Sequence, residues 1–167
     1  MELKYNDFNF IELVNSVSKW SWQELVFGVD NKFITDSEII EYAKFILTED
    51  IVGFDFVLEL SIAEGDEDIQ GFLRELVSLE SIQNEQSIKE KWLYAILLHL
   101  YNNKDKYEDA LDMVEEIYAD FDYPEEMAGF VKYMPAENSA YGFESYPCEN
   151  LYKLWQRYLK SKEGIFK

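Results

Sequence analysis

The sequence predicts an all-α fold. Ser21 and Glu24 have the capping-box spacing, in which a hydroxyl and a carboxylate three residues apart bind the free amides of a first helical turn. Thr35 and Glu38 repeat the pattern. Apolar residues then recur at helical spacing, and strand-like alternation is hard to find. We expect a single compact domain over residues 1–167, with about seven helices packed as antiparallel hairpins.

Helices follow one another through the first half of the chain. The capping boxes open two of them, and the second is expected to run over 36–47. The segment 54–62 is a candidate for another helix, and an apolar stripe after Gly65 predicts one more. The helix over 36–47 has an apolar stripe of Ile39, Ile40, Ala43, Ile46 and Leu47. The stripe after Gly65 consists of Ile69, Phe72, Leu73, Leu76 and Val77.

Two adjacent helices are predicted in the second half. Residues 87–101 are apolar nearly all the way round, as expected of a central helix enclosed by its neighbours. The acidic helix that follows has an apolar arc of about 120° and a separate acidic arc of about 140°. Its apolar arc holds Tyr107, Ala110, Leu111, Val114, Ile117, Tyr118 and Phe121. One face of this helix should pack and the other should carry bare charge.

The remaining elements lead to a basic final helix. Residues 123–126 predict a short helix with proline at its first position, and 134–149 predict an ordered loop that contains three aromatic side chains. The final helix has an apolar stripe at ideal spacing and a cationic opposite face. The stripe is Leu151, Leu154, Trp155, Tyr158 and Leu159, and the cations are Lys153, Arg157, Lys160 and Lys162.

Composition indicates a folded protein that avoids polyanions. The chain is 48% apolar and 17% aromatic, which is too hydrophobic for a disordered acidic tail despite a net charge of −19. The same charge argues against nucleic acid and anionic membranes as partners, because their phosphates are bound by lysine and arginine.

The chain is expected to be soluble and cytoplasmic. Cys148 is the sole cysteine, so no internal disulfide can form, and the first residues lack the pattern of a secretory signal. The longest apolar run, 92–101, is about half of the roughly 20 residues that span a bilayer.

The most unusual feature is the acidic run over 105–126. It carries ten acidic side chains against one base, Lys106. The acids are Asp105, Glu108, Asp109, Asp112, Glu115, Glu116, Asp120, Asp122, Glu125 and Glu126. Charge this dense destabilises a protein through self-repulsion, which favours a use such as binding a basic partner. The alternative is a solvated face, partly balanced by the basic final helix.

No cofactor or metal site is predicted. Asp66, Asp68 and Gly71 fall at the first, third and sixth positions of a calcium-binding loop, but Val77 stands where the bidentate glutamate belongs. A di-metal helical bundle needs two histidines, and the chain has one.

No catalytic constellation is found either, so the protein is not expected to be an enzyme. His99 shares a helix side with Trp92 and Ile96, which favours a residue at the edge of the core. Cys148 has no nucleophile signature, and the phosphate-binding glycine pattern is absent. A metal-dependent enzyme with clustered carboxylates remains a third class, which predicts a bound ion.

Several segments resemble a bacterial family known as domain of unknown function 2247. They are Ile-Tyr-Ala-Asp-Phe at 117–121, Tyr-Pro-Glu-Glu at 123–126, Phe-Val-x-Tyr-Met-Pro at 130–135, the Lys91-Trp92 helix and the Trp155 helix. The family has no established enzymatic activity, so the resemblance carries over no catalytic residues. It implies a small cytoplasmic protein of the kind often encoded beside polymorphic toxins, and therefore an immunity protein.

The leading hypothesis is a non-catalytic protein that binds a basic partner, such as a toxin domain. Its expected binding residues are Asp105, Glu108, Asp109, Asp112, Glu115, Glu116 and Asp120, with Tyr141, Phe143 and Tyr146 as buried anchors. The alternative is a helical interaction or scaffold protein, which would use its acids for solubility and could be homodimeric. The sequence leaves the oligomeric state open.

Overall fold

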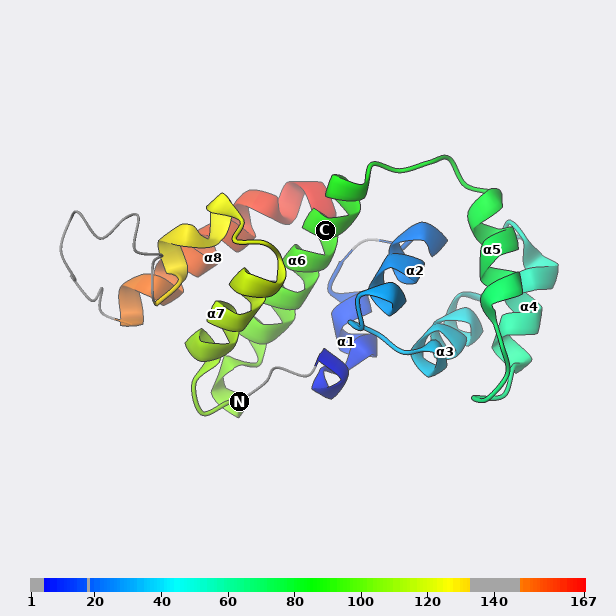
Figure 1. Cartoon of the computed structure of the whole chain (residues 1–167), viewed down its shortest axis with the longest axis horizontal. Coiled ribbons are helices and arrows are strands. Elements are labelled where there is room, and N and C mark those ends of the chain that lie inside the picture. Colours follow the sequence, from blue (N-terminus) through cyan, green and yellow to red (C-terminus); the bar gives the residue numbers. More distant parts are fainter. Residues whose placement is uncertain (1–4, 18, 133–147) are drawn as a thin grey trace. The chain divides into compact units, whose positions relative to one another are not determined.

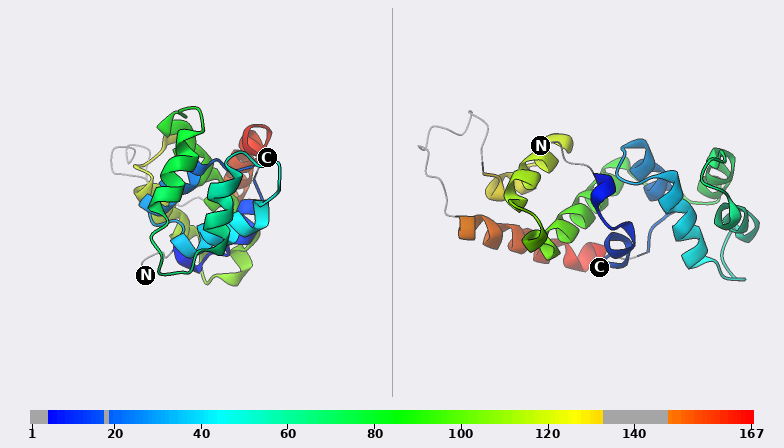
Figure 2. Two further views of the ribbon diagram at one scale, coloured as in Figure 1. Left: turned by 90° about the vertical axis from the view of Figure 1, so that its right-hand side faces the viewer. Right: turned by 90° about the horizontal axis from the view of Figure 1, so that it is seen from below.

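The protein is all-helical wherever its structure is described. The computed structural model describes residues 5–17, 19–132 and 148–167, and over these ranges it contains eight α-helices, three short 3-10 helices and no strand (Figure 1 and Figure 2). The α-helices are α1 (Phe10–Asn15), α2 (Trp22–Asp30), α3 (Asp36–Ile46), α4 (Phe54–Ile62), α5 (Gln70–Ser78), α6 (Glu85–Asn102), α7 (Ala110–Asp120) and α8 (Cys148–Phe166). The 3-10 helices are η1 (Tyr5–Asp7), η2 (Lys104–Lys106) and η3 (Glu125–Phe130). The predicted fold class is confirmed.

The chain forms two compact units that divide within α6. The N-terminal unit spans Lys4–Trp92 and the C-terminal unit spans Leu93–Lys167. Each unit has its own buried side chains. The expectation of one domain over residues 1–167 stays a prediction.

Both predicted capping boxes are present in the N-terminal unit. The Ser21 hydroxyl accepts from the Glu24 amide at 3.1 Å, and the Glu24 carboxylate accepts from the Ser21 amide. Thr35 and Glu38 form the same reciprocal pair at the start of α3. Since each box supplies partners for amides that lack one inside the helix, these two helices begin at the predicted residues.

Helices α3, α4 and α5 pack in sequence order, and α2 also packs against α5. The start of α4 matches the predicted segment because Gly53 adopts a left-handed conformation, with φ of +74°, in the preceding turn. A side chain at this position would also crowd Leu76 and Leu79 of the α5 end. Glycine is therefore required twice here, for conformation and for space.

A second glycine allows two helices to meet closely. A β-carbon added to Gly28 of α2 would overlap the indole of Trp92, which belongs to the first half of α6. The Trp92 indole nitrogen donates to the Glu24 carbonyl oxygen at 2.7 Å. Its ring also lies near Trp20, with ring centroids 4.5 Å apart. Trp92 is completely buried, so it is a centre of the N-terminal core.

The C-terminal unit is built around Trp155 of α8, which is also completely buried. Tyr101 of α6 meets it edge-on with ring centroids 5.1 Å apart, and Phe130 of η3 stacks parallel to it at 6.2 Å. The rings of Phe166 in α8 and Tyr94 in α6 also lie together, with centroids 5.4 Å apart. The apolar stripe predicted for the final helix therefore does face a core.

The acidic helix is shorter than expected. α7 begins at Ala110, because Asp109 is its N-cap. The Asp109 side chain accepts a hydrogen bond from the Leu111 amide in the first turn. Asp105 lies in the separate helix η2 and Glu108 lies in the segment between the two. The single acidic arc predicted from helical projection is therefore wrong for these residues.

Candidate functional site

The acidic surface consists of the seven predicted acids Asp105, Glu108, Asp109, Asp112, Glu115, Glu116 and Asp120. Asp105, Glu108, Asp112 and Asp120 are exposed, and the other three are half-buried. The opposite face of α7 is buried through Ala110, Leu111, Val114, Ile117 and Tyr118. The predicted division of this helix into a packing face and a charged face is confirmed from Ala110 onward.

Lys132 is a cation that contacts this surface, and it comes from outside the acidic run. Its amine pairs with the Asp109 carboxylate and, at 2.9 Å, with the Asp112 carboxylate. Burial opposes the charge on Lys132, but hydrogen bonds to both carboxylates raise its pKa above the ordinary value. The Lys132 hydrogen bond also lowers the pKa of Asp109, although burial partly opposes this. One end of the acidic surface is therefore partly neutralised, with one amine against two carboxylates.

Glu115 shows the opposite effect. Burial raises the pKa of its carboxyl, and the neighbouring charges of Asp112 and Glu116 raise it further, while Lys132 lowers it. Its ionised form is therefore less stable here than in water. The fold places the carboxylates of Asp112, Glu115 and Glu116 close enough to repel one another. A cation from a partner would reduce this repulsion.

The basic final helix meets the acidic run through Lys162. The amine of Lys162 lies 2.8 Å from the Glu126 carboxylate, which belongs to η3. α8 packs against η3, so this ion pair joins two elements already in contact. The predicted balance between the charge runs is thus present at the end of the acidic run.

The predicted aromatic anchors, Tyr141, Phe143 and Tyr146, lie outside the described residues. The structure therefore places only the acidic part of the predicted binding site.

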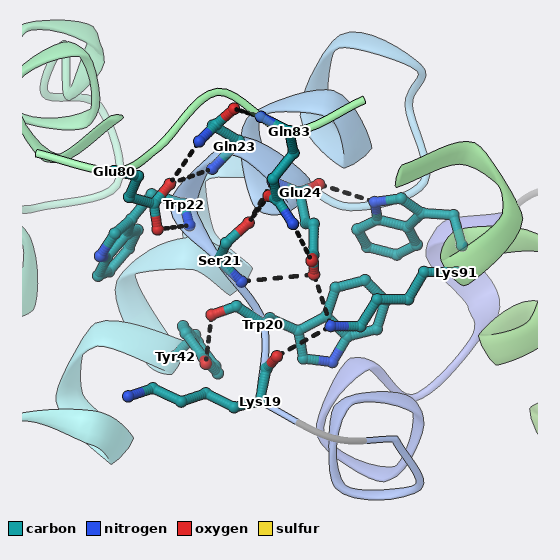
Figure 3. Close-up of polar contacts among 11 residues, drawn as sticks. Lys19, Trp20, Ser21, Trp22, Gln23, Glu24, Tyr42, Glu80, Gln83 and Lys91 are labelled. Carbon is teal, nitrogen blue, oxygen red and sulfur yellow. Dashed lines mark hydrogen bonds and ion pairs between the residues drawn. The ribbon is translucent and has the colours of Figure 1, made fainter. Parts of the chain in front are cut away.

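A second polar cluster, which the sequence did not predict, lies in the N-terminal unit (Figure 3). Its centre is an ion pair between Lys91 of α6 and Glu24 of α2, with the amine 2.6 Å from the carboxylate oxygen. The two side chains are 9% and 6% exposed. The Lys91 amine also donates to the Lys19 carbonyl oxygen at 2.8 Å and lies 4.6 Å from the Trp20 ring centroid. Buried charges need this kind of complete pairing.

The segment after α5 completes the cluster from the other side of α2. Both carboxylate oxygens of Glu80 accept hydrogen bonds from the first amides of α2, at Trp22 and Gln23. The Gln83 side chain donates to the Glu24 carboxylate at 3.1 Å. Figure 3 shows these side chains converging on the start of α2 from both directions. This geometry fixes the N-terminus of α2, and the side chains of Glu24, Glu80 and Lys91 all have structural partners.

One sequence signal could have revealed this cluster. Lys91 immediately precedes the apolar run of α6, so its amine must find a partner close to the core. The partner cannot be read from the sequence, because 66 positions separate Glu24 and Lys91.

The family comparison supports the resemblance found in the sequence. A family model for domain of unknown function 2247, described as an uncharacterized protein conserved in bacteria, matches residues 10–163. The chain belongs to this family. The matched range includes both the acidic surface and the Glu24–Lys91 cluster. No curated protein and no solved structure matches the chain.

Three further features concern metal binding, His99 and membrane spans in the described part of this family member. No three histidine, cysteine or acidic side chains gather there as a group able to hold a metal ion. His99 is buried, with the Asn103 amide 3.5 Å from its ring nitrogen Nδ1. Among the same residues, no helix combines the length and the apolar character needed to cross a membrane.

Proposed function

We propose that the protein binds a basic protein partner through the acidic surface, in the manner of an immunity protein that neutralises a bacterial toxin. The observation that carries the proposal is the arrangement of α7, whose apolar face is buried while its other face presents carboxylates that repel one another at Glu115. A cationic partner would turn this repulsion into attraction and would be steered toward the surface at long range.

The family resemblance supports the same class of function. Proteins of this kind are expected beside polymorphic toxins, and toxin nuclease domains are commonly basic. An acidic inhibitor then gains rapid association and resembles the phosphate backbone that such a toxin binds. The protein performs no chemistry in this proposal.

The test measures association with the native partner. The partner is purified with the protein from its bacterial host, and the association rate constant is measured by stopped-flow at low salt. The double variant Glu108→Lys, Glu115→Lys leaves the Asp109 cap intact and should lower this rate constant by about tenfold. The matched control is Glu64→Lys, Glu67→Lys, which makes the same charge change at exposed positions of the N-terminal unit.

Specific use of the acidic surface requires the first variant to slow association much more than the control. Equal slowing would show that net charge alone acts, and unchanged rates at all salt concentrations would refute the proposal. A protein that forms only a self-dimer by light scattering, with no stoichiometric basic partner, would favour the scaffold alternative.

A further inference from the structure

The N-terminal unit contains an open hollow at its surface, and none of the lining residues belongs to the acidic surface. Its cavity volume is about 360 Å³, within the range of about 300–1,000 Å³ typical of ligand pockets. Trp20, which precedes the Ser21 cap of α2, and Trp22, the first residue of α2, line it, together with residues from the α3–α4 connection and the end of α5. The side chains at its edge include Val52 and Leu79, which are 71% and 53% exposed.

The apolar edge of the hollow is too exposed to be explained by packing within the unit. The Leu79 side chain lies where a β-carbon of Gly53 would be crowded, and Val52 directly precedes that glycine. The left-handed conformation of Gly53 therefore sets the turn that carries Val52 next to the hollow. Exposed apolar side chains around a concave surface are typical of a binding site for another apolar group.

Charge around the hollow selects the kind of partner. Its ionisable lining residues are Lys19, Asp50 and Glu80, which together carry one net negative charge. The Glu80 carboxylate is held by the amides of Trp22 and Gln23, whereas Asp50 is exposed. The chain as a whole carries −19, so a second copy of it would be repelled. A cationic segment is attracted at long range by the net charge of the chain, and Asp50 offers it an exposed carboxylate at the hollow, where Lys19 is also exposed.

We infer that this hollow docks a basic peptide segment of a partner protein, with one large apolar side chain inserted beside Trp20 and Trp22 and a flanking cation next to Asp50. The inference goes beyond the proposed function, because it concerns the N-terminal unit and does not require the acidic surface. The inserted side chain would bury Val52 and Leu79, and the cation would give the site its preference for basic sequences.

The test uses three synthetic peptides with the full-length protein. They are the amides of acetylated Lys-Lys-Phe-Lys-Lys, Lys-Lys-Ala-Lys-Lys and Glu-Glu-Phe-Glu-Glu, titrated at 0.15 M salt and followed by backbone amide and indole NMR signals. The first peptide should shift signals of Trp20, Trp22 and residues 50–52. It should bind at least about fivefold more tightly than the alanine peptide, as expected for burial of an aromatic ring.

Matched variants locate the binding. Val52→Ser should weaken the phenylalanine peptide severalfold, whereas Phe45→Ser, which changes a comparably exposed apolar residue outside the hollow, should not. Asp50→Asn should also weaken it, and Glu67→Asn is the control for the exposed charge. The variant Glu108→Lys, Glu115→Lys should retain the preference for phenylalanine over alanine, which separates this inference from the proposed function.

Three results would overturn the inference. The phenylalanine and alanine peptides could bind equally, which would leave charge as the only attraction. The acidic peptide could bind as tightly as the basic one, which would remove the charge preference. The shifts could be absent at millimolar peptide or could fall on α7 instead of the hollow.

Discussion

Glu24 has several structural roles at once, and its ion pair with Lys91 is one of them. The Glu24 carboxylate belongs to the capping box of α2, accepts from Gln83 and neutralises the buried Lys91 amine. Its own backbone carbonyl accepts from the Trp92 indole. Removing either charge would leave the other buried without its counterion, which costs more than the ion pair itself contributes.

We expect Lys91→Met to lower the free energy of unfolding by about 3 kcal/mol, because it leaves the Glu24 carboxylate buried and unpaired. The double variant Glu24→Gln, Lys91→Met should cost less than the sum of the two single changes. Urea unfolding followed by circular dichroism measures all three values.

The control for this prediction is Lys44→Met, which removes an exposed ion pair with Glu41 at a similar distance of 2.9 Å. Because both of its side chains are more than half exposed, its loss should cost about 0.5 kcal/mol or less. Equal costs for the two lysine variants, or strict additivity in the double variant, would contradict the buried-pair interpretation.

At the scale of elements, the start of α7 depends on one side chain with two roles. Asp109 caps the helix through the Leu111 amide and binds the Lys132 amine. Lys132 also binds Asp112 in the first turn of α7, so the segment after η3 is fastened to the beginning of this helix. Both roles use the ionised carboxylate to advantage.

We expect Asp109→Asn to reveal the ionic role through pH. Asparagine can still cap the helix, but the charge is lost. Because the pKa of Asp109 is lowered by folding, its charge stabilises the protein above the ordinary value of about 3.9 and this contribution is lost as pH falls through the lower folded value. The variant should be less stable at pH 7 by up to about 1 kcal/mol, with allowance for solvent screening, and the difference should shrink as the pH falls below the ordinary pKa of Asp109.

Thermal unfolding of both proteins between pH 2 and pH 7 tests this expectation. Asp109→Ala serves for comparison, because it removes the cap as well and should cost about 1 kcal/mol more than the asparagine variant at neutral pH. A difference between wild type and Asp109→Asn that is equally large at pH 2 and pH 7 would rule out the ionic contribution.

At the scale of the whole molecule, a chain of 167 residues carries a net charge of −19, so its acidic groups repel one another. The ion pairs of Lys132 and Lys162 offset part of it in the C-terminal unit. Burial is the main cause of the raised pKa of Glu115, and the charges of Asp112 and Glu116 add to it beside the Lys132 pair. A net charge this far from neutrality is expected to oppose folding through self-repulsion.

Raising the KCl concentration from 0.01 M to 0.15 M should raise the melting temperature by several degrees, because the Debye length falls from about 30 Å to about 8 Å and the repulsion is screened. The variant Glu108→Lys, Glu115→Lys should show a smaller rise, since two charge reversals change −19 to −15. Scanning calorimetry measures both. A melting temperature that falls with added KCl would mean that attractive pairs outweigh repulsion.

Local features of the fold could be predicted from the sequence, since they depend on residues a few positions apart. The capping boxes at Ser21 and Thr35 are examples, as is the buried face of α7. The early start predicted for the acidic helix failed because projection onto a helix takes no account of the Asp109 side chain, which prefers to cap.

The sequence by itself thus determined the helical class, the starts of α2, α3 and α4 and the concentration of acid in one region, because these follow from spacing along the chain. Only the tertiary structure decided which charges are neutralised. Lys91 pairs with Glu24, and Lys132 pairs with Asp109 and Asp112. The hollow beside Trp20 and Trp22 likewise forms from segments distant in the sequence. Pairing and concavity depend on distance in space, which periodicity does not encode.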